Sequence, residues 1–420
     1  MFKAGEKAES VIDIDDAQTF QSMDGFGFAL TGGSAQLLMH MDAAKRAAIL
    51  HELFTNGKDA IGVSYLRVSI GSSDMNDHVF TYDDLPAGQT DANLAKFMLD
   101  PDRADVIPVL KEILAVNPKI QILGSPWSAP SWMKTNESPK DGNLKPEFYA
   151  VYAQYFVKYI QGMKAEDISI SAITVQNEPL NGKNTPSLVM SAEEENTFIK
   201  QALGPALRKA GITTKIILYD HNCDVPEYPL AILNDADARQ YVDGSGFHLY
   251  GGKIEAMSKV HDAYPAKNLY FTEQMVIDRP GDTQLRIAPP VERVLIGATR
   301  NWSRNVLLWN LAADPQNGPH TDNGGCPVCE GAITIDGNQI KRNVAFYVVA
   351  HASKFVPSGS TRIASTLIDG LPNVAFKTPS GKTVLIVANN SLADHPFAIR
   401  FHGKTAAAAL SAGSVATFIW

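Results

Sequence analysis

Short apolar segments suited to buried strands alternate along this chain with segments of helical periodicity, and the alternation repeats eight times. The strand-like segments are residues 25–30, 65–70, 119–123, 172–175, 215–219, 246–249, 269–272 and 305–309. Helical spacing between them is clearest over 43–54 and 147–160. Eight alternating units predict an α/β protein with a (β/α)₈ TIM barrel. A doubly wound sheet is the alternative, but it usually has fewer strands and a glycine-rich phosphate loop after its first strand.

The glycines near the first predicted strand do not form such a phosphate loop. Residues 25–33 read Gly-Phe-Gly-Phe-Ala-Leu-Thr-Gly-Gly. They lack the spacing of a dinucleotide-binding fingerprint and the acidic residue that follows about 20 positions later. Close backbone packing at the first barrel strand explains these glycines better.

The pattern changes near the C-terminus. Short alternating segments separated by Gly, Pro and Ser turns predict a small antiparallel β-sandwich. Two early segments, 11–16 and 19–21, also look like strands, and we expect them to pair with this tail. The predicted domains are residues 1–23, which join the β-domain, the catalytic barrel at 24–356, and the β-domain at 357–420.

Composition narrows the class of protein. The formal net charge of −8 argues against a nucleic-acid binder, which would normally carry a basic face. No apolar run approaches the ~18 residues needed to span a bilayer, so stable membrane insertion is not expected. The first seven residues lack the apolar stretch of a signal peptide. Either the protein is cytoplasmic, or a leader has been removed.

Three cysteines bear on the compartment. Cys326 and Cys329 form a Cys-Pro-Val-Cys pair in a loop rich in Gly, Asn and Asp, and Cys223 is distant in the sequence. The pair can be a local disulfide, two free thiols or part of a metal site, of which the metal site is the least favoured. A loop disulfide would fit an oxidising compartment. We therefore expect a secreted, periplasmic or cell-surface protein, with the cytoplasm as the alternative.

Two glutamates end predicted barrel strands. Glu178 follows the fourth strand and Glu273 the seventh. A carboxylate at the end of a buried strand is costly unless its charge or proton is used. The carboxyl ends of barrel strands converge on one face, so both side chains should face one cleft. Two carboxylates in one cleft are the catalytic groups that most glycosidases use to hydrolyse a glycosidic bond.

The remaining strand ends carry aromatic, amide and charged side chains. Such a mixture suits a sugar, because C–H faces stack on aromatic rings while hydroxyls need polar partners. Arg67, on the second strand, needs a buried carboxylate partner, so its first role is structural: it holds a glutamate ionised. The candidate substrate-binding residues are Arg67, Asp74, Trp127, Asn177, His248, Tyr250, Trp309 and His320. Ser125, Trp132, Asp220, His221, Asn222 and Asn310 are further strand-end candidates.

Four motifs resemble those of glycoside hydrolase family 30, in the same order along nearly the whole chain. They are Gly25-Phe-Gly-Phe-Ala-Leu-Thr, Ser125-Pro-Trp-Ser-Ala-Pro-Ser-Trp-Met-Lys-Thr-Asn, Val175-Gln-Asn-Glu-Pro and Tyr270-Phe-Thr-Glu-Gln. This family includes glucosylceramidases and endo-β-1,6-glucanases. The resemblance implies that Glu178 is the acid/base, Glu273 the nucleophile and Asn177 the partner of the sugar 2-hydroxyl. It also implies that Trp127, His248, Tyr250 and Trp309 line the subsite of the cleaved sugar.

Departures from the family pattern bear on the substrate. Glucosylceramidases of the animal type carry an aspartate where this chain has Gly32, and Gly-Pro-Asn-Trp where it has Gly-Pro-His320-Thr. Loss of a hydroxyl partner should open the non-reducing end of the pocket. We therefore predict an endo-β-1,6-glucanase. A glucosylceramidase or an exo-acting β-glucosidase is the alternative, although no loop looks apolar enough to bind a ceramide.

The predicted mechanism is retaining hydrolysis without a metal or organic cofactor. It requires carboxyl groups ~5–5.5 Å apart. It also requires a raised pKa for Glu178, with Glu273 kept ionised by Arg67 and Tyr250. Two other classes compete: a catalytically silent carbohydrate-binding barrel, and a metal-dependent hydrolase. The second would recruit Asp220, His221, His248 and the two neighbouring cysteines.

Overall fold

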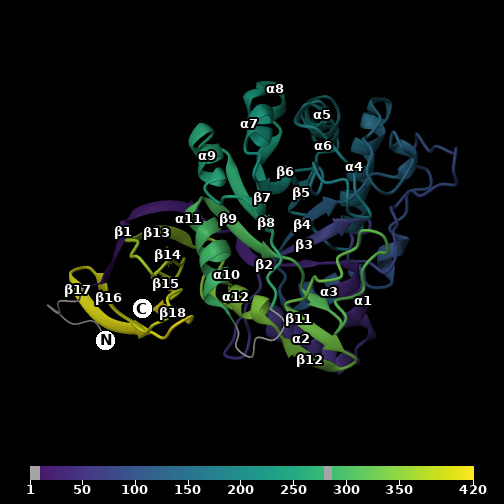
Figure 1. The fold of residues 1–420 in the computed structure, drawn as a ribbon. Coiled ribbons are helices and arrows are strands. Elements are labelled where there is room, and N and C mark those ends of the chain that lie inside the picture. Colours follow the sequence, from purple (N-terminus) through teal and green to yellow (C-terminus); the bar gives the residue numbers. More distant parts are fainter. Residues whose placement is uncertain (1–9, 279–285) are drawn as a thin grey trace.

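The predicted TIM barrel is confirmed. The structure, a computed structural model, describes residues 10–278 and 286–420, which form a barrel with a β-domain beside it (Figure 1). Eight parallel strands close the barrel in sequence order, and each overlaps its predicted segment. They are β2 (Gly25–Leu30), β3 (Tyr65–Ile70), β4 (Gln121–Pro126), β5 (Ala172–Thr174), β6 (Lys215–Cys223), β7 (Val242–Gly252), β8 (Asn268–Glu273) and β9 (Ser303–Leu308).

Helices surround the strands. Their amphipathic faces pack on the outside of the barrel in one continuous apolar layer. A smaller apolar cluster, to which Tyr65, Tyr270 and Leu307 belong, comes from the strands themselves. The α-helices are α1 (Gly32–His40), α2 (Ala43–Phe54), α3 (Val106–Val116), α4 (Tyr149–Ala165), α5 (Ala192–Phe198), α6 (Gly204–Lys209), α7 (Glu227–Asn234), α8 (Ala236–Arg239), α9 (Ala256–Ala263), α10 (Ala288–Pro290), α11 (Gly297–Arg300) and α12 (Val344–Ser353).

Tighter and wider helical turns complete several of these helices. Turns of the 3₁₀ type cover Asp100–Arg103, Ser131–Met133 and Pro146–Phe148. Wider π-type turns, Ile199–Leu203 and Val291–Ile296, join α5 to α6 and α10 to α11. The beginning of α5 follows from local sequence. The Ser191 hydroxyl accepts a hydrogen bond from the backbone N–H of Glu194, and the Glu194 carboxylate accepts one from the backbone N–H of Ser191. This capping box ends the loop that follows β5.

The β-domain is a seven-stranded sheet that unites both ends of the chain. Strand β1 (Val11–Ser22) lies inside it, parallel to β16 (His395–Phe401) and antiparallel to β13 (Thr361–Ser365), so the predicted pairing of the early strands with the tail is confirmed. Residues 1–9, on which the signal-peptide argument rests, lie outside the described residues. The other strands are β13 (Thr361–Ser365), β14 (Asn373–Lys377), β15 (Thr383–Ala388), β16 (His395–Phe401), β17 (Lys404–Leu410) and β18 (Val415–Ile419).

This sheet folds over on itself, so its two sides enclose a second core. Phe397 of β16 contacts Phe418 of β18 with ring centroids 6.0 Å apart, although the two strands are far apart in the order of the sheet. Phe401 and Trp420 make a similar contact at 5.5 Å. The result is the predicted β-sandwich.

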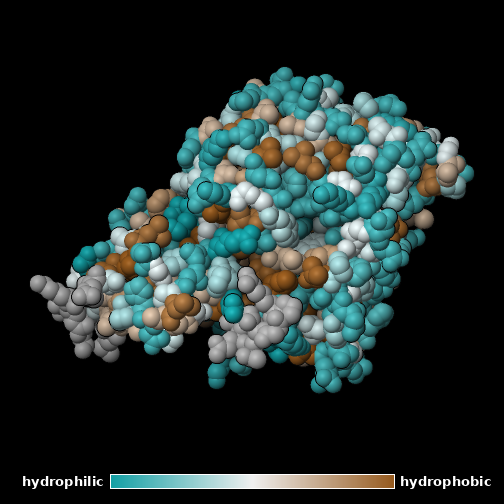
Figure 2. All heavy atoms as spheres, viewed as in Figure 1, coloured by the Kyte–Doolittle hydropathy of each residue, from teal (hydrophilic) through white to brown (hydrophobic). Residues whose placement is uncertain are grey.

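The loop after β9 carries a further small sheet, made of β10 (Ala312–Ala313), β11 (Ile333–Asp336) and β12 (Gln339–Arg342). Within the described ranges, none of the helices is long and apolar enough to cross a bilayer. Figure 2 shows a mostly hydrophilic surface on the face viewed there, with apolar side chains in small patches.

Candidate active site

The carboxyl ends of the barrel strands surround a cavity of about 440 Å³. This volume is typical of a small-molecule site. Both predicted catalytic glutamates line it and are 7% exposed. The other lining residues are Asp74, Trp127, Asn177, Leu180, Asn181, Lys183, Asn184, His221, Asn222, Tyr250, Met275, Trp309, Cys326 and Cys329.

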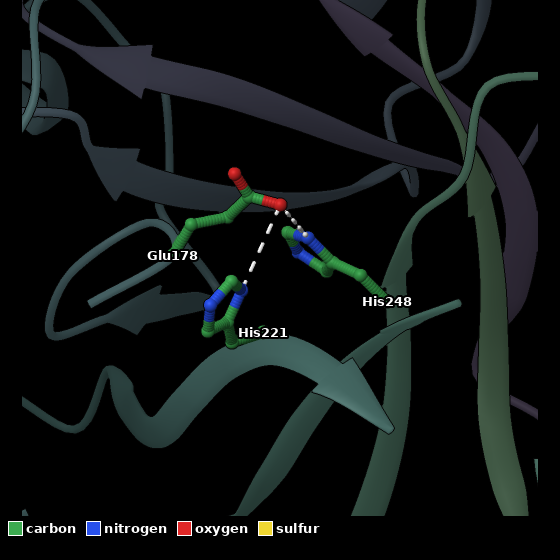
Figure 3. Close-up of side chains that lie close together, drawn as sticks. All are labelled: Glu178, His221 and His248. Carbon is green, nitrogen blue, oxygen red and sulfur yellow. Dashed lines mark hydrogen bonds and ion pairs between the residues drawn. The ribbon is translucent and has the colours of Figure 1, made fainter. Parts of the chain in front are cut away.

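Glu178 is held by contacts to both carboxylate oxygens. Asn181 Nδ2 donates to Oε2 at 2.7 Å, while Oε1 lies 3.2 Å from His248 Nδ1 and 3.7 Å from His221 Nδ1 (Figure 3). The backbone N–H of Glu178 donates to the Asp220 carbonyl at 3.0 Å. Its φ of 45° lies in the left-handed region, which is costly for a residue other than glycine and is often found at functional sites.

Glu273 receives two hydrogen bonds from cationic and phenolic donors. Arg67 Nη1 donates to Oε2 at 2.6 Å, and Tyr250 Oη donates to Oε1 at 3.0 Å. Tyr250 Oη in turn accepts the backbone N–H of Met275 at 2.9 Å, so the phenol proton is directed at Glu273. This environment matches the predicted role of Arg67 and Tyr250 as partners of that carboxylate.

The two glutamates face each other across His248. Glu178 Oε1 is 3.2 Å and Glu273 Oε1 is 3.9 Å from the same atom, His248 Nδ1. The two Oε1 atoms therefore lie no further apart than the sum of these distances, about 7 Å, which leaves out the wider spacings of the ~6.5–9.5 Å range of inverting glycosidases. The geometry is compatible with the shorter spacing of a retaining pair.

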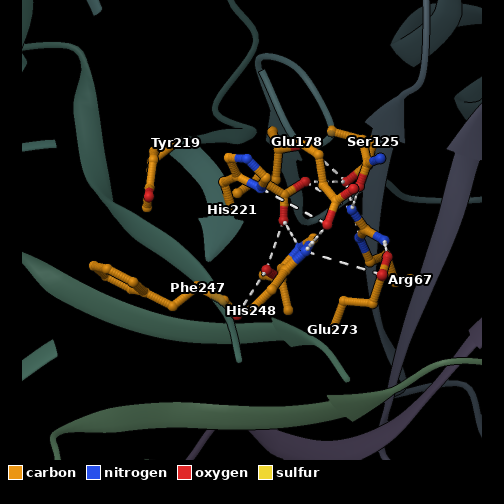
Figure 4. A network of polar contacts seen from close by, with 12 residues as sticks. Arg67, Ser125, Glu178, Tyr219, His221, Phe247, His248 and Glu273 are labelled. Carbon is orange, nitrogen blue, oxygen red and sulfur yellow. Dashed lines mark hydrogen bonds and ion pairs between the residues drawn. The ribbon is translucent and has the colours of Figure 1, made fainter. Parts of the chain in front are cut away.

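Arg67 forms the floor of the site and has no solvent exposure. Besides Glu273 it bonds Ser125 Oγ at 3.1 Å, and Asn177 Oδ1 and Asp220 Oδ2 at 2.7 Å each (Figure 4). Because the Asn177 carbonyl oxygen accepts from Arg67, the amide N–H groups of Asn177 remain for a ligand in the cavity.

Asp220 links the floor to the imidazole. Its Oδ1 accepts Thr272 Oγ1 at 2.6 Å and lies 3.0 Å from His248 Nε2. Tyr219 and Asp220 have φ values of 72° and 51°, at an irregularity in the pairing of β6 with β7. Such irregularities re-aim side chains. Here the side chain of Asp220 turns inward, under the cavity.

The pKa values of the glutamates differ from the predicted order. Burial alone would raise the pKa of Glu178, but the imidazoles of His221 and His248 beside its carboxylate hold it well below its usual range. Burial raises the pKa of Glu273, against the lowering effect of His248 and Arg67. Burial would lower the pKa of His248, but Glu273, Asp220 and Glu178 raise it to about 9. The expectation of a raised pKa for Glu178 is therefore wrong for the ligand-free site, because two imidazoles face that carboxylate.

One wall of the cavity suits a sugar ring. The rings of Trp127 and Trp309 lie 5.4 Å apart at 32°. Among the described residues, Trp127 Nε1 is buried without a hydrogen-bond partner. Burial, together with the charges of Glu273 and Glu178, raises the pKa of Asp74 to about 8, so its carboxyl group can donate as well as accept at neutral pH. These groups match the hydroxyls and C–H faces of a carbohydrate.

Three predicted substrate-binding residues do not line this cavity. Arg67 and His248 are fully buried beneath it, and they position the residues that do line it. His320 lies beyond the lining, with Nδ1 3.1 Å from the Thr321 carbonyl oxygen. The predicted opening at Gly32 is also wrong, because a side-chain carbon there would lie 1.9 Å from Asn76 Nδ2. Asn76 fills the space.

Cys326 and Cys329 form a disulfide that lines the cavity, which resolves the alternatives left open by their spacing. Cys329 is buried in an apolar cluster with both wall tryptophans. The same loop is anchored before Cys326, where Thr321 N donates to the Asp74 carbonyl at 2.9 Å. The two sulfurs cannot be metal ligands in this state.

Several residues of the site were not assigned a role from the sequence. Asp220 and Ser125 were strand-end candidates without a function in the glycosidase, and no role was predicted for Thr272 or Asn181. Asn181 alone had a usable signal, because it lies three residues after Glu178 in the loop that must cover the cleft. The others are small polar residues inside strands, and such residues usually have only structural roles.

Comparison with known proteins gives the family. The model of the glycosyl hydrolase family 30 TIM-barrel domain matches residues 23–356, and that of the family's β-sandwich domain matches residues 359–418. An endo-1,6-β-D-glucanase of Trichoderma harzianum, BGN16.3, is 33% identical over 90% of this chain and 80% of its own length. The lysosomal acid glucosylceramidase of Mus musculus is 28% identical over 98% of this chain and 83% of its own.

Two solved structures share the whole architecture. The endo-β1,6-glucanase BT3312 is 37% identical with a TM-score of 0.91, over 99% of this chain and 94% of that one. SrfJ from Salmonella typhimurium is 27% identical with a TM-score of 0.93, over 100% and 95%. This chain belongs to glycosyl hydrolase family 30 and is a glycoside hydrolase.

Proposed function

We propose that this protein is an endo-acting β-1,6-glucanase that retains the anomeric configuration. The observation that carries the mechanism is the pair of carboxylates, Glu178 and Glu273, that approach one atom, His248 Nδ1, from two barrel strands. The two Oε1 atoms lie no more than about 7 Å apart, which is compatible with the ~5–5.5 Å spacing of a retaining pair.

In the first step Glu273 attacks the anomeric carbon and Glu178 protonates the departing glycosidic oxygen. Arg67 and Tyr250 orient Glu273, and positive charge developing at the anomeric carbon favours its ionised form. Glu178 needs one proton for this step. His248 Nδ1, 3.2 Å away, is placed to supply it, since Asp220 fixes the other ring nitrogen.

In the second step a water molecule replaces the leaving group and hydrolyses the glycosyl-enzyme. Glu178 now acts as base, removes the proton from this water and returns it to His248 Nδ1, which restores the starting state. No step requires a metal or an organic cofactor. Asn181, bonded to Glu178 Oε2, holds the carboxylate in one orientation through both steps.

The glucose ring at the cleavage point would stack against the pair of wall tryptophans. Trp127 Nε1 and the protonated carboxyl of Asp74 would bond its hydroxyls, and the Asn177 amide would bond the 2-hydroxyl. These groups recognise a hexose with equatorial hydroxyls, and they do not by themselves select a linkage.

The β-1,6 linkage is supported by the relatives. Those named endo-1,6-β-glucanases are 32–37% identical to this chain, whereas those named glucosylceramidases are 27–28% identical. One observation favours a glucosylceramidase as second candidate: Leu180, on the cavity wall beside Glu178, is 43% exposed and could contact a lipid.

The test is parallel incubation with β-1,6-glucan, β-1,3-glucan and glucosylceramide, followed by measurement of product sizes. The proposal predicts oligosaccharides of several lengths from β-1,6-glucan early in the reaction. Glucose as sole early product would contradict endo action, and faster turnover of glucosylceramide would establish the second candidate.

We also propose that the protein works outside the reducing cytoplasm. The Cys326–Cys329 disulfide supports this, since such bonds persist in oxidising compartments. Fractionation of the producing cells, with the enzyme recovered only from the cytoplasm, would contradict it.

A further inference from the structure

Three side chains at one end of the cavity converge on a point that an ion could occupy. Glu178, His221 and His248 each present one ligand atom, and these atoms all lie within 4.8 Å of one another (Figure 3). The carboxylate oxygen is 3.2 Å from one imidazole nitrogen and 3.7 Å from the other. A tetrahedral zinc ion with bonds of about 2.0–2.2 Å would hold its ligands roughly 3.3–3.5 Å apart. The two distances to the carboxylate oxygen are close to this spacing, and the two imidazole nitrogens lie within 4.8 Å of each other.

His221 supplies an independent indication. Its Nδ1 is buried and has no hydrogen-bond partner within the described part of the chain, while the residue as a whole is 7% exposed. The distance of 3.7 Å from His221 Nδ1 to Glu178 Oε1 is too long for a hydrogen bond. It is suitable for two atoms that bind the same ion.

His248 has the supporting contact that metal-binding histidines usually have. Its second nitrogen, Nε2, lies 3.0 Å from Asp220 Oδ1, and Asp220 is itself bonded by Arg67 and Thr272. A carboxylate behind the histidine fixes the ring so that Nδ1 faces the ion. Asp220 therefore acts here as an outer partner of the site.

The charge of the region also suits a dication. The carboxylates of Glu178, Asp220 and Glu273 face one buried cation, Arg67, and Lys183 on the cavity wall adds a second. With His248 neutral, as a zinc ligand must be, carboxylates outnumber cations, and the ion takes the place of the imidazole proton. Two imidazoles and one carboxylate favour zinc over calcium or magnesium, which prefer all-oxygen sites.

We propose that Glu178, His221 and His248 bind one Zn²⁺ ion with a fourth position open to the cavity, and that this ion inhibits the enzyme. The ion occupies Glu178 Oε1, the oxygen that must exchange a proton with the substrate. The binding site does not depend on the proposed function, whereas the inhibition rests on Glu178 being the acid/base. This zinc is not a cofactor, so a chelator leaves activity unchanged or raises it.

The binding test uses tag-free, full-length, chelator-treated enzyme. Zn²⁺ is titrated by calorimetry, and Co²⁺ is added in a parallel sample to record its visible absorption. Wild type should bind one equivalent of Zn²⁺, and Co²⁺ should show the intense bands of tetrahedral coordination. His221→Ala should weaken binding by about 100-fold or more, since loss of an outer partner alone costs about 10–100-fold. His78→Ala, at a largely exposed histidine, is the matched control and should bind as wild type.

A second variant keeps the test decisive if His221→Ala does not fold. Glu178→Gln preserves shape but removes the anionic ligand, so it should also lose the bound ion. Zn²⁺ binding of wild-type strength in either folded variant would overturn the site. Zn²⁺ binding that depends on both residues but leaves glucan hydrolysis unaffected would uphold the site and refute Glu178 as the acid/base.

Discussion

Arg67 and Asp220 form an ion pair, with 2.7 Å between Nη2 and Oδ2, in which neither side chain has any solvent exposure. Each partner reaches a different glutamate. Arg67 bonds Glu273 directly, while Asp220 reaches Glu178 through His248 and through its own backbone carbonyl. One buried pair therefore sets the positions of both carboxylates.

Removing the charge of Asp220 should damage stability and activity together. Asp220→Asn leaves Arg67 with a single carboxylate in a buried site, and loss of one partner of such a pair costs about 3–5 kcal/mol. The free energy of unfolding, from urea titration, measures the effect. Asp24→Asn is the matched control, because the Asp24–Arg304 pair is partly exposed and should cost less. Equal losses in the two variants would contradict the account.

The two glutamates should respond differently to the leaving group. Glu178→Gln and Glu273→Gln should both abolish glucan hydrolysis. With a dinitrophenyl β-glucoside, whose leaving group needs no proton, Glu178→Gln should still form the glycosyl-enzyme and release dinitrophenol in a burst. Glu273→Gln should not, because no nucleophile remains. A burst from the Glu273 variant instead would reverse the assignment.

Asn181 should matter for proton transfer more than for binding. Its hydrogen bond to the Glu178 carboxylate is worth about 1.5–3 kcal/mol, so Asn181→Ala should lower kcat on glucan by roughly 10–100-fold with little change in KM. Asn184→Ala, at a neighbouring lining position, is the control and should keep kcat within a few-fold. A loss that appears only in KM would show that Asn181 binds the substrate instead.

Asp74 should make stability depend on pH. The unfolded carboxyl ionises near pH 4, while the folded one stays protonated up to about pH 8. Between these values the unfolded chain releases a proton that the folded chain keeps, so wild type loses stability as the pH rises. Asp74→Asn cannot ionise, and its stability relative to wild type should increase from pH 5 to pH 8 by on the order of 2–4 kcal/mol. Parallel profiles from urea unfolding would refute a raised pKa.

The disulfide should stabilise the cavity wall rather than the whole fold. It closes a loop of only four residues, so its loss costs about 2 kcal/mol. In the Cys326→Ser/Cys329→Ser variant the wall beside Trp309 becomes mobile, and kcat/KM on glucan should fall more than the melting temperature suggests. Dithiothreitol should reproduce the effect in wild type and leave the double variant unchanged.

Much of the fold could be predicted from the sequence, because the local residue patterns and the tertiary structure agree. The strand runs and the strand-end glutamates were visible as apolar segments that end on a charge. Strand β17 is not predicted by its sequence, because Lys-Thr-Ala-Ala-Ala-Ala-Leu is mostly alanine, and its pairing with β16 makes it a strand. The full length of β7 was missed because its first half is rich in glycine and serine.

The active site was harder to predict from the sequence than the fold, because its electrostatics depend on contacts between strands that are far apart in the sequence. Nothing near Glu178 in the sequence shows that His221 and His248, 43 and 70 residues later, will face it. The pKa of Glu178 was therefore predicted with the wrong sign. Asn76 likewise fills the space beside Gly32 from another strand's loop, which a comparison of aligned motifs does not reveal.

The most direct test of the central claim is the configuration of the sugar first released from β-1,6-glucan. Proton NMR follows the anomeric signals during the first minutes of hydrolysis, before mutarotation mixes them. Double displacement through Glu273 predicts that the β-anomer appears first and the α-anomer only later. Initial release of the α-anomer would contradict the retaining mechanism and the roles assigned to both glutamates.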